Sequence, residues 1–424
     1  MKQIAIIGSG PAGCFLADQL LRLVRDARID VIERLPVPFG LVRYGVAPDH
    51  QGTKAVTRLL DRVLARDTVR FFGNVEVGRD VTLDELQQMY DAVVVATGAP
   101  RDRRPGIPGQ DLPGVTGSAA FVGWYNSHPD HRAPELRDVR SVVVIGNGNV
   151  AIDVARILAK TPDELAGSDL SPTAHAALQQ QSIEEIHIVG RRGPADARFT
   201  HAELAELGRL AGASTRIAEP ELLDEAPAAA GADTGEGKAK NTEIIEVLRG
   251  FAQDERDCPI RIVFHFGASP AAFEGAERLE SVRFERRGRD PLVLPAQLAV
   301  TCIGYQSIDC CRLVPDSGFF ANDGARISDG LYVTGWAGRG PSGTIPVNRA
   351  EAQRVAQRIA GELEDHGRGG GEALAALLAQ RGVEVVDHAG WHRIDAAERE
   401  QASAQRCRDK FDSVDAMLAV VRAG

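Results

Sequence analysis

The chain has 424 residues, more than one ordinary hydrophobic core holds, so we expect two domains of roughly 200 residues each. Hydrophobic residues make up 44% and charged residues 25% of the chain, as in globular proteins. The net charge of −10 disfavours a nucleic-acid partner, and no apolar run approaches the ~20 residues of a membrane helix. We therefore expect neither nucleic-acid binding nor membrane insertion.

The first residues and the cysteines bear on compartment and redox chemistry. A strand is predicted almost from the first residue, which leaves no room for a signal peptide, so we expect a cytoplasmic protein. The six cysteines show no C-x-x-C or C-x4-C spacing, so we expect no metal centre and no redox disulfide. The adjacent Cys310 and Cys311 are interpreted as ordinary thiols. For the oligomeric state we expect a monomer or a weak dimer.

Strands and helices alternate along the first part of the chain. Residues 3–8 are a predicted buried strand, followed by a glycine turn and a helix to about residue 25. A second strand at 29–32 ends at an acidic residue. An amphipathic helix is predicted over 51–66 and another buried strand over 91–96. This alternation indicates a largely parallel α/β sheet.

The same pattern then restarts. A strand at 141–145 is followed by a glycine turn and a helix through residue 158, and the next strand covers 186–189. Two strand–glycine–helix units predict an α/β fold with two dinucleotide-binding (Rossmann-like) domains. Residues 224–240 are predicted to be a surface loop, and residues 366–371 a flexible connection into a helical C-terminal piece.

The first glycine turn, Gly8-Ser9-Gly10-Pro11-Ala12-Gly13, has the G-x-G-x-x-G pattern between a strand and a helix. Gly8 permits the tight turn, Gly10 lets a pyrophosphate approach the backbone, and Gly13 lets the helix pack on the strand. The phosphates are then expected on free N–H groups at the helix N-terminus. Glu33 ends the second strand about 20 residues further on, where a carboxylate binds ribose hydroxyls. The alternative for Glu33 is a solvated acid at a strand end.

Two later segments favour FAD over NAD at this first site. Ala96-Thr97-Gly98 follows a buried strand, as in flavoproteins that bind two dinucleotides. Gly330 to Trp336 is a short predicted strand that ends in glycine. Glutathione-reductase-like enzymes have Gly-Asp at this point, whereas this chain has Gly335-Trp336.

The second glycine turn, Gly146-Asn147-Gly148-Asn149-Val150-Ala151, predicts an NADP site. An NAD site would place an acid after the next strand, but this chain has Gly190-Arg191-Arg192-Gly193. Two guanidiniums suit a 2′-phosphate, which arginine binds through two parallel hydrogen bonds. The alternative is a basic surface turn. Arg191 lies 43 residues after Gly148, about twice the usual distance, which we attribute to an insertion at about 160–182.

At these residues the chain resembles the adrenodoxin reductase family, the FAD-dependent NADP–ferredoxin reductases with a glutathione-reductase-like fold. The resemblance covers most of the chain and is weakest in residues 224–240 and beyond Arg399, where Gln405 to Lys410 departs from the family pattern. It rests on six motifs, namely Pro38 to His50, Phe72 to Val75, Val144 to Ala151, Val189 to Pro194, Gly335 to Ile345, and Gly390-Trp391-x-x-Ile394-Asp395.

The resemblance implies an NADP-binding domain at 104–330, inserted in an FAD-binding domain formed by residues 1–103 and 331–424. It implies FAD contacts at Ala12, Glu33, Leu41, Val75, Trp336, Gly343, Thr344 and Ile345. It implies NADP contacts at Arg103, Asn147, Gly148, Asn149, Val150, Arg191, Arg192, Glu203 and Gly343.

The resemblance also implies an enzyme, a ferredoxin–NADP(+) reductase (EC 1.18.1.-) that passes electrons from NADPH through FAD to a ferredoxin or flavodoxin. Without a redox thiol pair, electrons must leave the flavin directly for an external carrier. We assign His50 and Glu206 to proton handling and nicotinamide positioning. The alternative for His50 is a structural turn residue. For Glu203 it is a capping box with Thr200.

Other functions stay open, namely an NADPH-binding flavoprotein regulator and the reductase subunit of a larger complex. Because ferredoxins are generally acidic and this chain has a net charge of −10, docking requires a local basic surface. We expect that surface at six arginines: Arg209, Arg216, Arg249 and Arg256, with Arg22 and Arg25.

Overall fold

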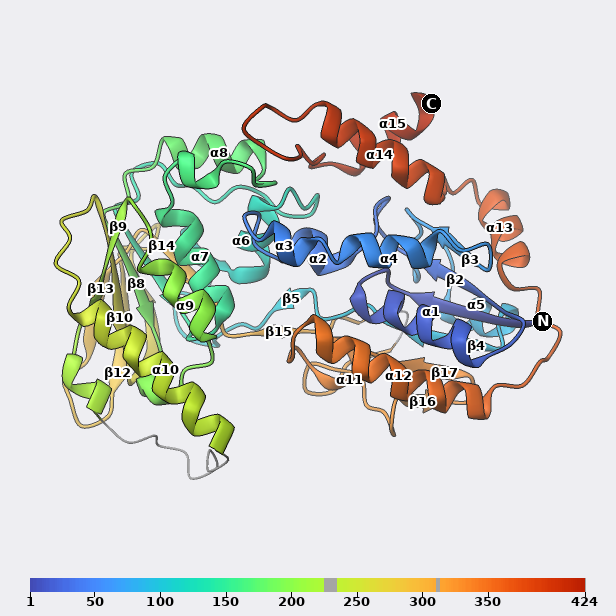
Figure 1. The fold of residues 1–424 in the computed structure, drawn as a ribbon, viewed down its shortest axis with the longest axis horizontal. Helices are drawn as coiled ribbons and strands as arrows, with labels where there is room; N and C mark the ends of the chain where they lie inside the picture. Colours follow the sequence, from blue (N-terminus) through green and yellow to red (C-terminus); the bar gives the residue numbers. More distant parts are fainter. Residues whose placement is uncertain (225–234, 310–312, 424) are drawn as a thin grey trace. The chain divides into compact units, whose positions relative to one another are not determined.

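The computed structural model describes residues 1–224, 235–309 and 313–423 (Figure 1). Cys310 and Cys311 lie outside the described residues. The chain divides into two compact units. Unit 1 comprises Met1–Arg101, Asn126–Asp130 and Tyr305–Gly424, and unit 2 comprises Asp102–Tyr125 and His131–Gly304. No described helix combines the length and apolar character that a bilayer crossing requires.

Unit 1 is built on a six-stranded sheet whose strands are parallel except at one edge. In spatial order the strands are β16 (Arg326–Ser328), β17 (Leu331–Val333), β4 (Ala92–Val95), β1 (Lys2–Ile7), β2 (Ala27–Ile32) and β3 (Val69–Phe72). Alternate residues of β1 serve opposite faces, since Ile4 and Ile6 belong to one core cluster and Ala5 and Ile7 to another. Burial on both faces explains the apolar runs of β4 and of residues 4–7 in β1.

Helices cover both faces of this sheet (Figure 1). On one face α1 packs against α4 and α12, and on the other α5 packs against α13. The helices of unit 1 are α1 (Pro11–Leu23), α2 (Gly40–Tyr44), α3 (Gln51–Lys54), α4 (Thr57–Leu64), α5 (Leu83–Met89), α11 (Trp336–Arg339), α12 (Ile345–Glu362), α13 (Gly370–Gln380), α14 (His388–Glu400) and α15 (Val414–Ala423).

The C-terminal helices are fastened to the first part of unit 1 by buried polar contacts. Arg43 of α2 pairs with Glu398 of α14, and both side chains are almost fully buried. Lys410 also lies inside, with its Nζ 3.2 Å from the Oδ1 of Asn126. The same oxygen accepts a 2.8 Å hydrogen bond from Lys54. These contacts explain why the short segment around Asn126 belongs to unit 1.

Unit 2 contains a second six-stranded sheet, with parallel pairing throughout. Its order is β6 (Val115–Gly117), β14 (Leu298–Thr301), β7 (Ser141–Ile145), β8 (Glu185–Val189), β10 (Ile260–His265) and β9 (Ala213–Ile217). An antiparallel sheet of β11 (Ala268–Glu274), β12 (Ser281–Arg286) and β13 (Leu292–Pro295) packs on one face. A two-stranded sheet pairs β5 (Arg101–Asp102) with β15 (Tyr305–Gln306).

The other face of the second sheet is covered by helices. They are α6 (Ser118–Tyr125), α7 (Asn149–Ala159), α8 (Pro172–Gln179), α9 (His201–Leu207) and α10 (Gly235–Ala252), with short 3-10 turns at η1 (Asp163–Leu165), η2 (Pro194–Asp196) and η3 (Pro220–Asp224). The insertion predicted at about 160–182 is confirmed, because η1 and α8 lie between α7 and β8. The α/β fold class with two Rossmann-type sheets is likewise confirmed.

Three expectations differ from the structure. The predicted helix over 51–66 is interrupted between α3 and α4, where Lys54 turns inward to hydrogen-bond buried oxygens. The loop predicted at 224–240 is wrong from Gly235, where α10 begins, and residues 225–234 lie outside the described part. The chain returns to unit 1 at Tyr305 rather than at 331. Ser307 already belongs to unit 1, since its Oγ donates to the carbonyl of Gly98.

Candidate functional site

The first glycine turn is shaped by steric limits at two of its glycines. Gly8 has φ +110°, and a Cβ there would lie 2.5 Å from the carbonyl oxygen of Ala96. A Cβ on Gly13 would collide with the carbonyl oxygen of Gly8. At Gly10, by contrast, a Cβ would meet nothing within 4 Å. The backbone is therefore bare at Gly10, where a pyrophosphate has room to approach the uncapped start of α1.

Glu33 is held against this turn. Its Oε2 accepts hydrogen bonds from the backbone N–H (3.0 Å) and the hydroxyl (2.6 Å) of Ser9, and its Oε1 accepts from the N–H of Leu35 (3.2 Å). The carboxylate is thus bonded to the glycine turn, which argues against the solvated strand-end alternative. Its contact with a ribose stays a prediction.

The chain after Glu33 crosses the glycine turn. Phe39 donates its N–H to the carbonyl of Ser9 (3.2 Å), and its φ of +84° is unusual for a residue with a side chain. A Cβ on Gly40 would lie 3.3 Å from the Cα of Gly10. Next along the chain, Leu41 is 43% exposed and can cover a ligand, whereas Val75 is buried, which leaves its backbone as the part able to contact one.

The C-terminal glycine segment reaches the same turn. Gly335 follows β17 with φ +70°, and a Cβ there would lie 2.6 Å from the Cβ of Ala12. Trp336 donates from Nε1 to the carbonyl of Ser342 (3.0 Å), and its ring stacks on Tyr305 at a centroid distance of 5.9 Å. Unit 1 thereby gathers the predicted FAD residues from the two ends of the chain at the carboxyl ends of β1 and β17, where open α/β sheets bind ligands.

The third part of this site is the start of α12. Gly343 has φ +83°, a conformation that favours glycine, and Thr344 is the N-cap of the helix that begins at Ile345. The Thr344 side chain makes no capping hydrogen bond, so it leaves the first N–H groups of an 18-residue helix uncapped. These N–H groups can donate to a bound cofactor.

His50 is the N-cap of α3 and is half-buried. Its N–H donates to the carbonyl of Ala47 (3.0 Å), which closes a turn. The structural turn role is therefore seen directly. The proposed role of its imidazole in proton handling stays a prediction.

The second glycine turn repeats the geometry of the first. Gly146 has φ +141°, and a Cβ there would collide with the carbonyl oxygen of Cys302, while a Cβ on Gly148 would meet nothing within 4 Å. Gly148 is the N-cap of α7, so Asn149 and Val150 supply the first N–H groups of that helix. Asn149 is fixed in place, because its Oδ1 accepts from the N–H of Thr200 (2.8 Å).

Asn147 gives the clearest sign that this turn is shaped for a ligand. Its side-chain Nδ2 and Oδ1 are both buried, and neither has a hydrogen-bond partner among the described residues. Gly190 makes room for this amide, since a Cβ there would collide with Nδ2. Buried amides are almost always paired, so an orphan amide at a helix N-terminus fits a bound dinucleotide.

Arg191 and Arg192 follow β8, and both are exposed. The described residues offer neither guanidinium an ion pair or a hydrogen bond. The backbone around them is fixed to the end of β10, because Gly190 donates to the carbonyl of His265 (2.9 Å) and Gly267 to that of Arg192 (3.1 Å). Two positive charges on a held backbone suit a phosphate ligand.

The chain is similar in sequence to known proteins along most of its length. Residues 2–192 match the family described as pyridine nucleotide-disulphide oxidoreductase. The chain is 40% identical to NADPH-ferredoxin reductase FprA of Mycobacterium tuberculosis over 98% of each protein. It is 33% identical to the mitochondrial NADPH:adrenodoxin oxidoreductase of Arabidopsis thaliana over 98% of this chain and 94% of that protein. The chain belongs to the adrenodoxin reductase family.

The solved structures agree with this assignment. The structure of Mycobacterium tuberculosis FprA in complex with NADPH matches with a TM-score of 0.90 and 38% identity over the whole of both chains. The family predicted from the motifs is therefore confirmed.

In this adrenodoxin reductase family member, α9 carries the two acidic residues assigned to the NADP site. Thr200 Oγ1 accepts from the N–H of Glu203 (3.4 Å), which is the capping contact of the alternative interpretation. Glu206 lies 3.0 Å from Arg156, a side chain that is 1% exposed and also pairs with Asp153. Glu206 therefore neutralises a buried arginine, a structural role that the sequence did not indicate.

The last predicted contact, Arg103, comes just after the chain enters unit 2. Its N–H donates to the carbonyl of Gly304 (3.0 Å), and the side chain is exposed. With Asp102, Thr116 and Thr301 it lines a small cavity of unit 2. Arg156 and Tyr305 could not be found from the sequence, since Glu206 and Trp336, with which they pair, are distant in the chain and no local motif marks either residue.

Proposed function

We propose that this chain is a flavoprotein oxidoreductase that passes electrons from NADPH through FAD to a ferredoxin-type one-electron carrier, a ferredoxin–NADP(+) reductase (EC 1.18.1.-). The observation that carries the proposal is the pair of glycine turns, each with an open central glycine, of which the second is followed by two guanidiniums without partners among the described residues. The similarity to an NADPH-ferredoxin reductase and an NADPH:adrenodoxin oxidoreductase supports the same activity.

Unit 1 is the FAD-binding domain in this proposal, and unit 2 binds NADP. The start of α1 holds the FAD pyrophosphate, Glu33 binds the ribose, and the segment from Trp336 to Ile345 contacts the flavin. In unit 2 the start of α7 and the Asn147 amide hold the NADP pyrophosphate. Arg191 and Arg192 bind the 2′-phosphate. When bound, FAD accepts a hydride and releases electrons singly.

The thiols favour direct release of these electrons to an external carrier. Among the described residues, Cys14, Cys258 and Cys302 form no disulfide. Burial raises the pKa of the Cys14 thiol, which disfavours the reactive thiolate. We therefore infer a ferredoxin as the acceptor, for which a flavodoxin of similar one-electron chemistry can substitute. We also infer a cytoplasmic monomer or weak dimer as the working form.

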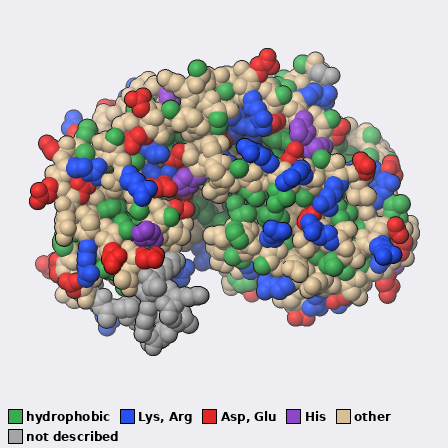
Figure 2. Space-filling view, in the orientation of Figure 1, with side chains coloured by type: hydrophobic (Ala, Val, Ile, Leu, Met, Phe, Trp, Pro, Cys, Tyr) green, Lys and Arg blue, Asp and Glu red, His purple; other side chains and the backbone are tan. Residues whose placement is uncertain are grey.

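The docking surface belongs to unit 1. Arg249 and Arg256 of unit 2, expected to dock the carrier, are paired with Asp224 and Asp254. Five exposed arginines on or next to α1, α4 and α12 have no partner among the described residues, and Figure 2 shows basic and hydrophobic side chains interspersed over these helices. These arginines, here called the basic face, are Arg25, Arg58, Arg62, Arg349 and Arg354. Leu23 and Leu59, also on this side, are 45% and 38% exposed. Charge complementarity fits an acidic ferredoxin.

Turnover with two acceptors tests the function. The purified protein should release FAD on denaturation, and it should oxidise NADPH with ferricyanide and with ferredoxin. Binding of both cofactors without turnover by either acceptor would favour the regulator. Turnover with ferricyanide alone, with every ferredoxin and flavodoxin of the host inactive, would favour a subunit that needs a larger complex.

A further inference from the structure

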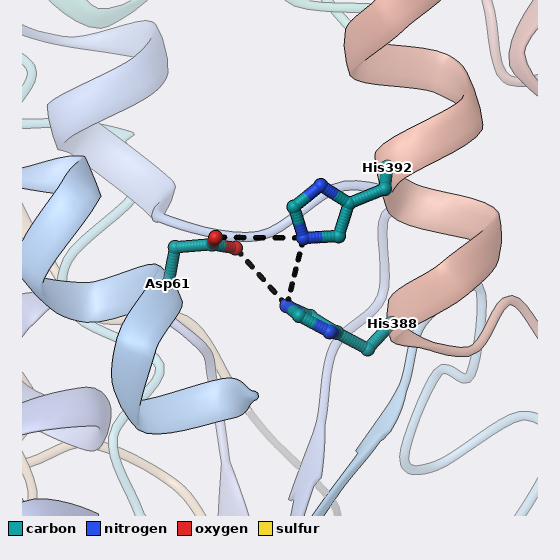
Figure 3. A group of neighbouring side chains, drawn as sticks. All are labelled: Asp61, His388 and His392. Carbon is teal, nitrogen blue, oxygen red and sulfur yellow. Dashed lines mark hydrogen bonds and ion pairs between the residues drawn. The ribbon is translucent and has the colours of Figure 1, made fainter. Parts of the chain in front are cut away.

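Two histidines and an aspartate converge at the point where α14 lies against α4 (Figure 3). His388 and His392 are four residues apart, so they project from the same face of α14, and Asp61 comes from α4. The Nε2 of His388 is 3.0 Å from the Oδ1 of Asp61, and the Nε2 of His392 is 3.4 Å from the Oδ2. The two Nε2 atoms are 3.2 Å apart. Each of the three side chains therefore lies next to the other two, and together they form a closed triangle of potential metal ligands.

Hydrogen bonding alone does not account for this triangle. Each Nε2 carries at most one proton, and the carboxylate carries none when ionised. If both histidines donate to Asp61, no proton lies between the two nitrogens, and two N–H dipoles face each other at 3.2 Å. If one histidine donates to the other, the second loses its bond to the carboxylate. One of the three sides is thus always without a hydrogen bond.

A metal ion at the centre accounts for all three sides. Zn²⁺ binds imidazole nitrogen and carboxylate oxygen at about 2.0–2.2 Å, and in a tetrahedron this places neighbouring ligand atoms about 3.3 Å apart. The two imidazole nitrogens, 3.2 Å apart, are close to that value, and each lies 3.0 or 3.4 Å from one oxygen of the Asp61 carboxylate. The donor set of two imidazoles and one carboxylate is also one that Zn²⁺ accepts.

The surroundings of the triangle hold its members and leave it open to solvent. Trp391 lies between the two histidines in sequence. Its Nε1 donates a 3.3 Å hydrogen bond to the Oδ1 of Asp61, which helps to orient the carboxylate. The side chains of Asp61 and His388 are 28% and 23% exposed, and that of His392 is 50% exposed. An ion can enter from solvent, and water can complete the coordination.

We propose that Asp61, His388 and His392 bind one divalent transition-metal ion, of which Zn²⁺ is the best fit, and that this ion clamps α14 onto α4. The cysteine spacings, on which the expectation of no metal centre rested, carry no sign of this site. The signal in the sequence is the His-x3-His spacing on a helix. The proposal does not depend on the electron-transfer function.

Zinc binding to the holoprotein tests this site. After treatment with a chelator and removal of the chelator, calorimetric titration should show one Zn²⁺ per chain. His392→Ala should weaken binding at least about 100-fold, because loss of a residue behind a metal ligand already costs roughly 10- to 100-fold. Asp61→Asn, which keeps the side-chain shape, should also weaken it. His175→Ala, a change on α8 outside the cluster, should leave the affinity unchanged.

Two further readouts separate this site from adventitious binding to thiols. Zn²⁺ should raise the thermal unfolding midpoint of the wild type but not that of His392→Ala, since a ligand stabilises the fold that binds it. Co²⁺ should give visible bands beyond the flavin absorption in the wild type alone. The proposal is overturned if the wild type binds no stoichiometric Zn²⁺, or if a folded, flavin-containing His392→Ala protein binds it with unchanged affinity.

Discussion

Arg191 and Arg192 are the two side chains that we expect to distinguish NADPH from NADH. Replacing both with alanine should raise the KM for NADPH by more than about tenfold, because each charge-assisted hydrogen bond contributes roughly 1.5–3 kcal/mol. The KM for NADH should barely change, since NADH has no 2′-phosphate. Steady-state kinetics with both cofactors and ferricyanide as acceptor measure this difference.

Arg287→Ala provides the matched control for this pair. Arg287 is an exposed arginine in the turn after β12 of unit 2 and has no partner among the described residues. Its loss should leave both KM values unchanged. Equal losses with NADPH and NADH in the double variant would show that the two arginines support the fold of the turn instead.

His187 and His265 form a buried pair in unit 2, with Nδ1 and Nε2 3.2 Å apart. Burial, together with the charges of His187 and Arg286, lowers the pKa of His265 to about 4. Between about pH 6.5 and pH 4 the unfolded chain therefore binds more protons at this residue than the folded chain does. The free energy of unfolding should fall as the pH falls through this window. His265 alone should lower it by about 2 kcal/mol between pH 7 and pH 5.

Denaturant unfolding at pH 7 and pH 5 measures this dependence. His265→Gln should reduce the difference between the two pH values, because the variant has no imidazole to protonate at that position. His201→Gln, at an exposed position of α9, should keep the wild-type difference. An unchanged difference in His265→Gln would place the acid sensitivity elsewhere.

At the scale of elements, the first glycine turn joins β1 to α1 through two glycines with different tasks. Gly13→Ala should destabilise unit 1 by about 1–3 kcal/mol, since its methyl group meets the carbonyl of Gly8 and forces the helix away from the strand. Gly10→Ala should fold normally but lose FAD affinity, because its methyl group occupies the space that the pyrophosphate needs.

Flavin content and the unfolding midpoint separate these two outcomes. Gly52→Ala is the control, since Gly52 lies in α3 and a Cβ there also meets nothing within 4 Å. That variant should keep both flavin and stability. Full flavin content in Gly10→Ala would contradict the assignment of the first turn to FAD.

The parts of the fold that could be predicted are those fixed by local pattern. The strands β1, β4 and β7 contain apolar runs because parallel strands are buried on both faces. The glycine turns follow from steric limits within a few residues. The break between α3 and α4 could not be predicted, because it depends on Lys54 reaching Asn126, a residue 72 positions away in the chain.

The same limit applies to the candidate sites. The residues of each glycine turn are neighbours in sequence, so the motif alone locates them. The Arg156–Glu206 pair and the triangle of Asp61, His388 and His392 join segments far apart in the chain. Their residue types are visible in the sequence, but their proximity is a product of packing.

For the whole molecule, the net charge of −10 opposes association with an acidic carrier, and the basic face of unit 1 supplies the local attraction. Reversing Arg349 and Arg354 to glutamate should slow ferredoxin reduction several-fold and leave ferricyanide reduction unchanged. Ferredoxin reduction by the wild type should also weaken with added salt, because exposed charges are screened beyond about 8 Å at physiological ionic strength.

Charge reversals in unit 2 serve as the comparison. Arg249→Glu with Arg256→Glu should have little effect on ferredoxin reduction, because Asp224 and Asp254 already neutralise these arginines. A large effect there, and none from Arg349 and Arg354, would move the docking surface to unit 2.

The discontinuity of unit 1 also has a consequence for synthesis of the chain on the ribosome. β4 ends at Val95, but β17, its parallel neighbour, begins at Leu331. The ribosome adds ~5–20 residues per second, so tens of seconds pass between the synthesis of β4 and that of β17. During this time one edge of β4 has no neighbouring strand. Unit 2, apart from its first segment, is contiguous and can complete its own sheet during that interval. We therefore expect the nascent chain to fold its second Rossmann sheet first and to acquire flavin only near the end of translation.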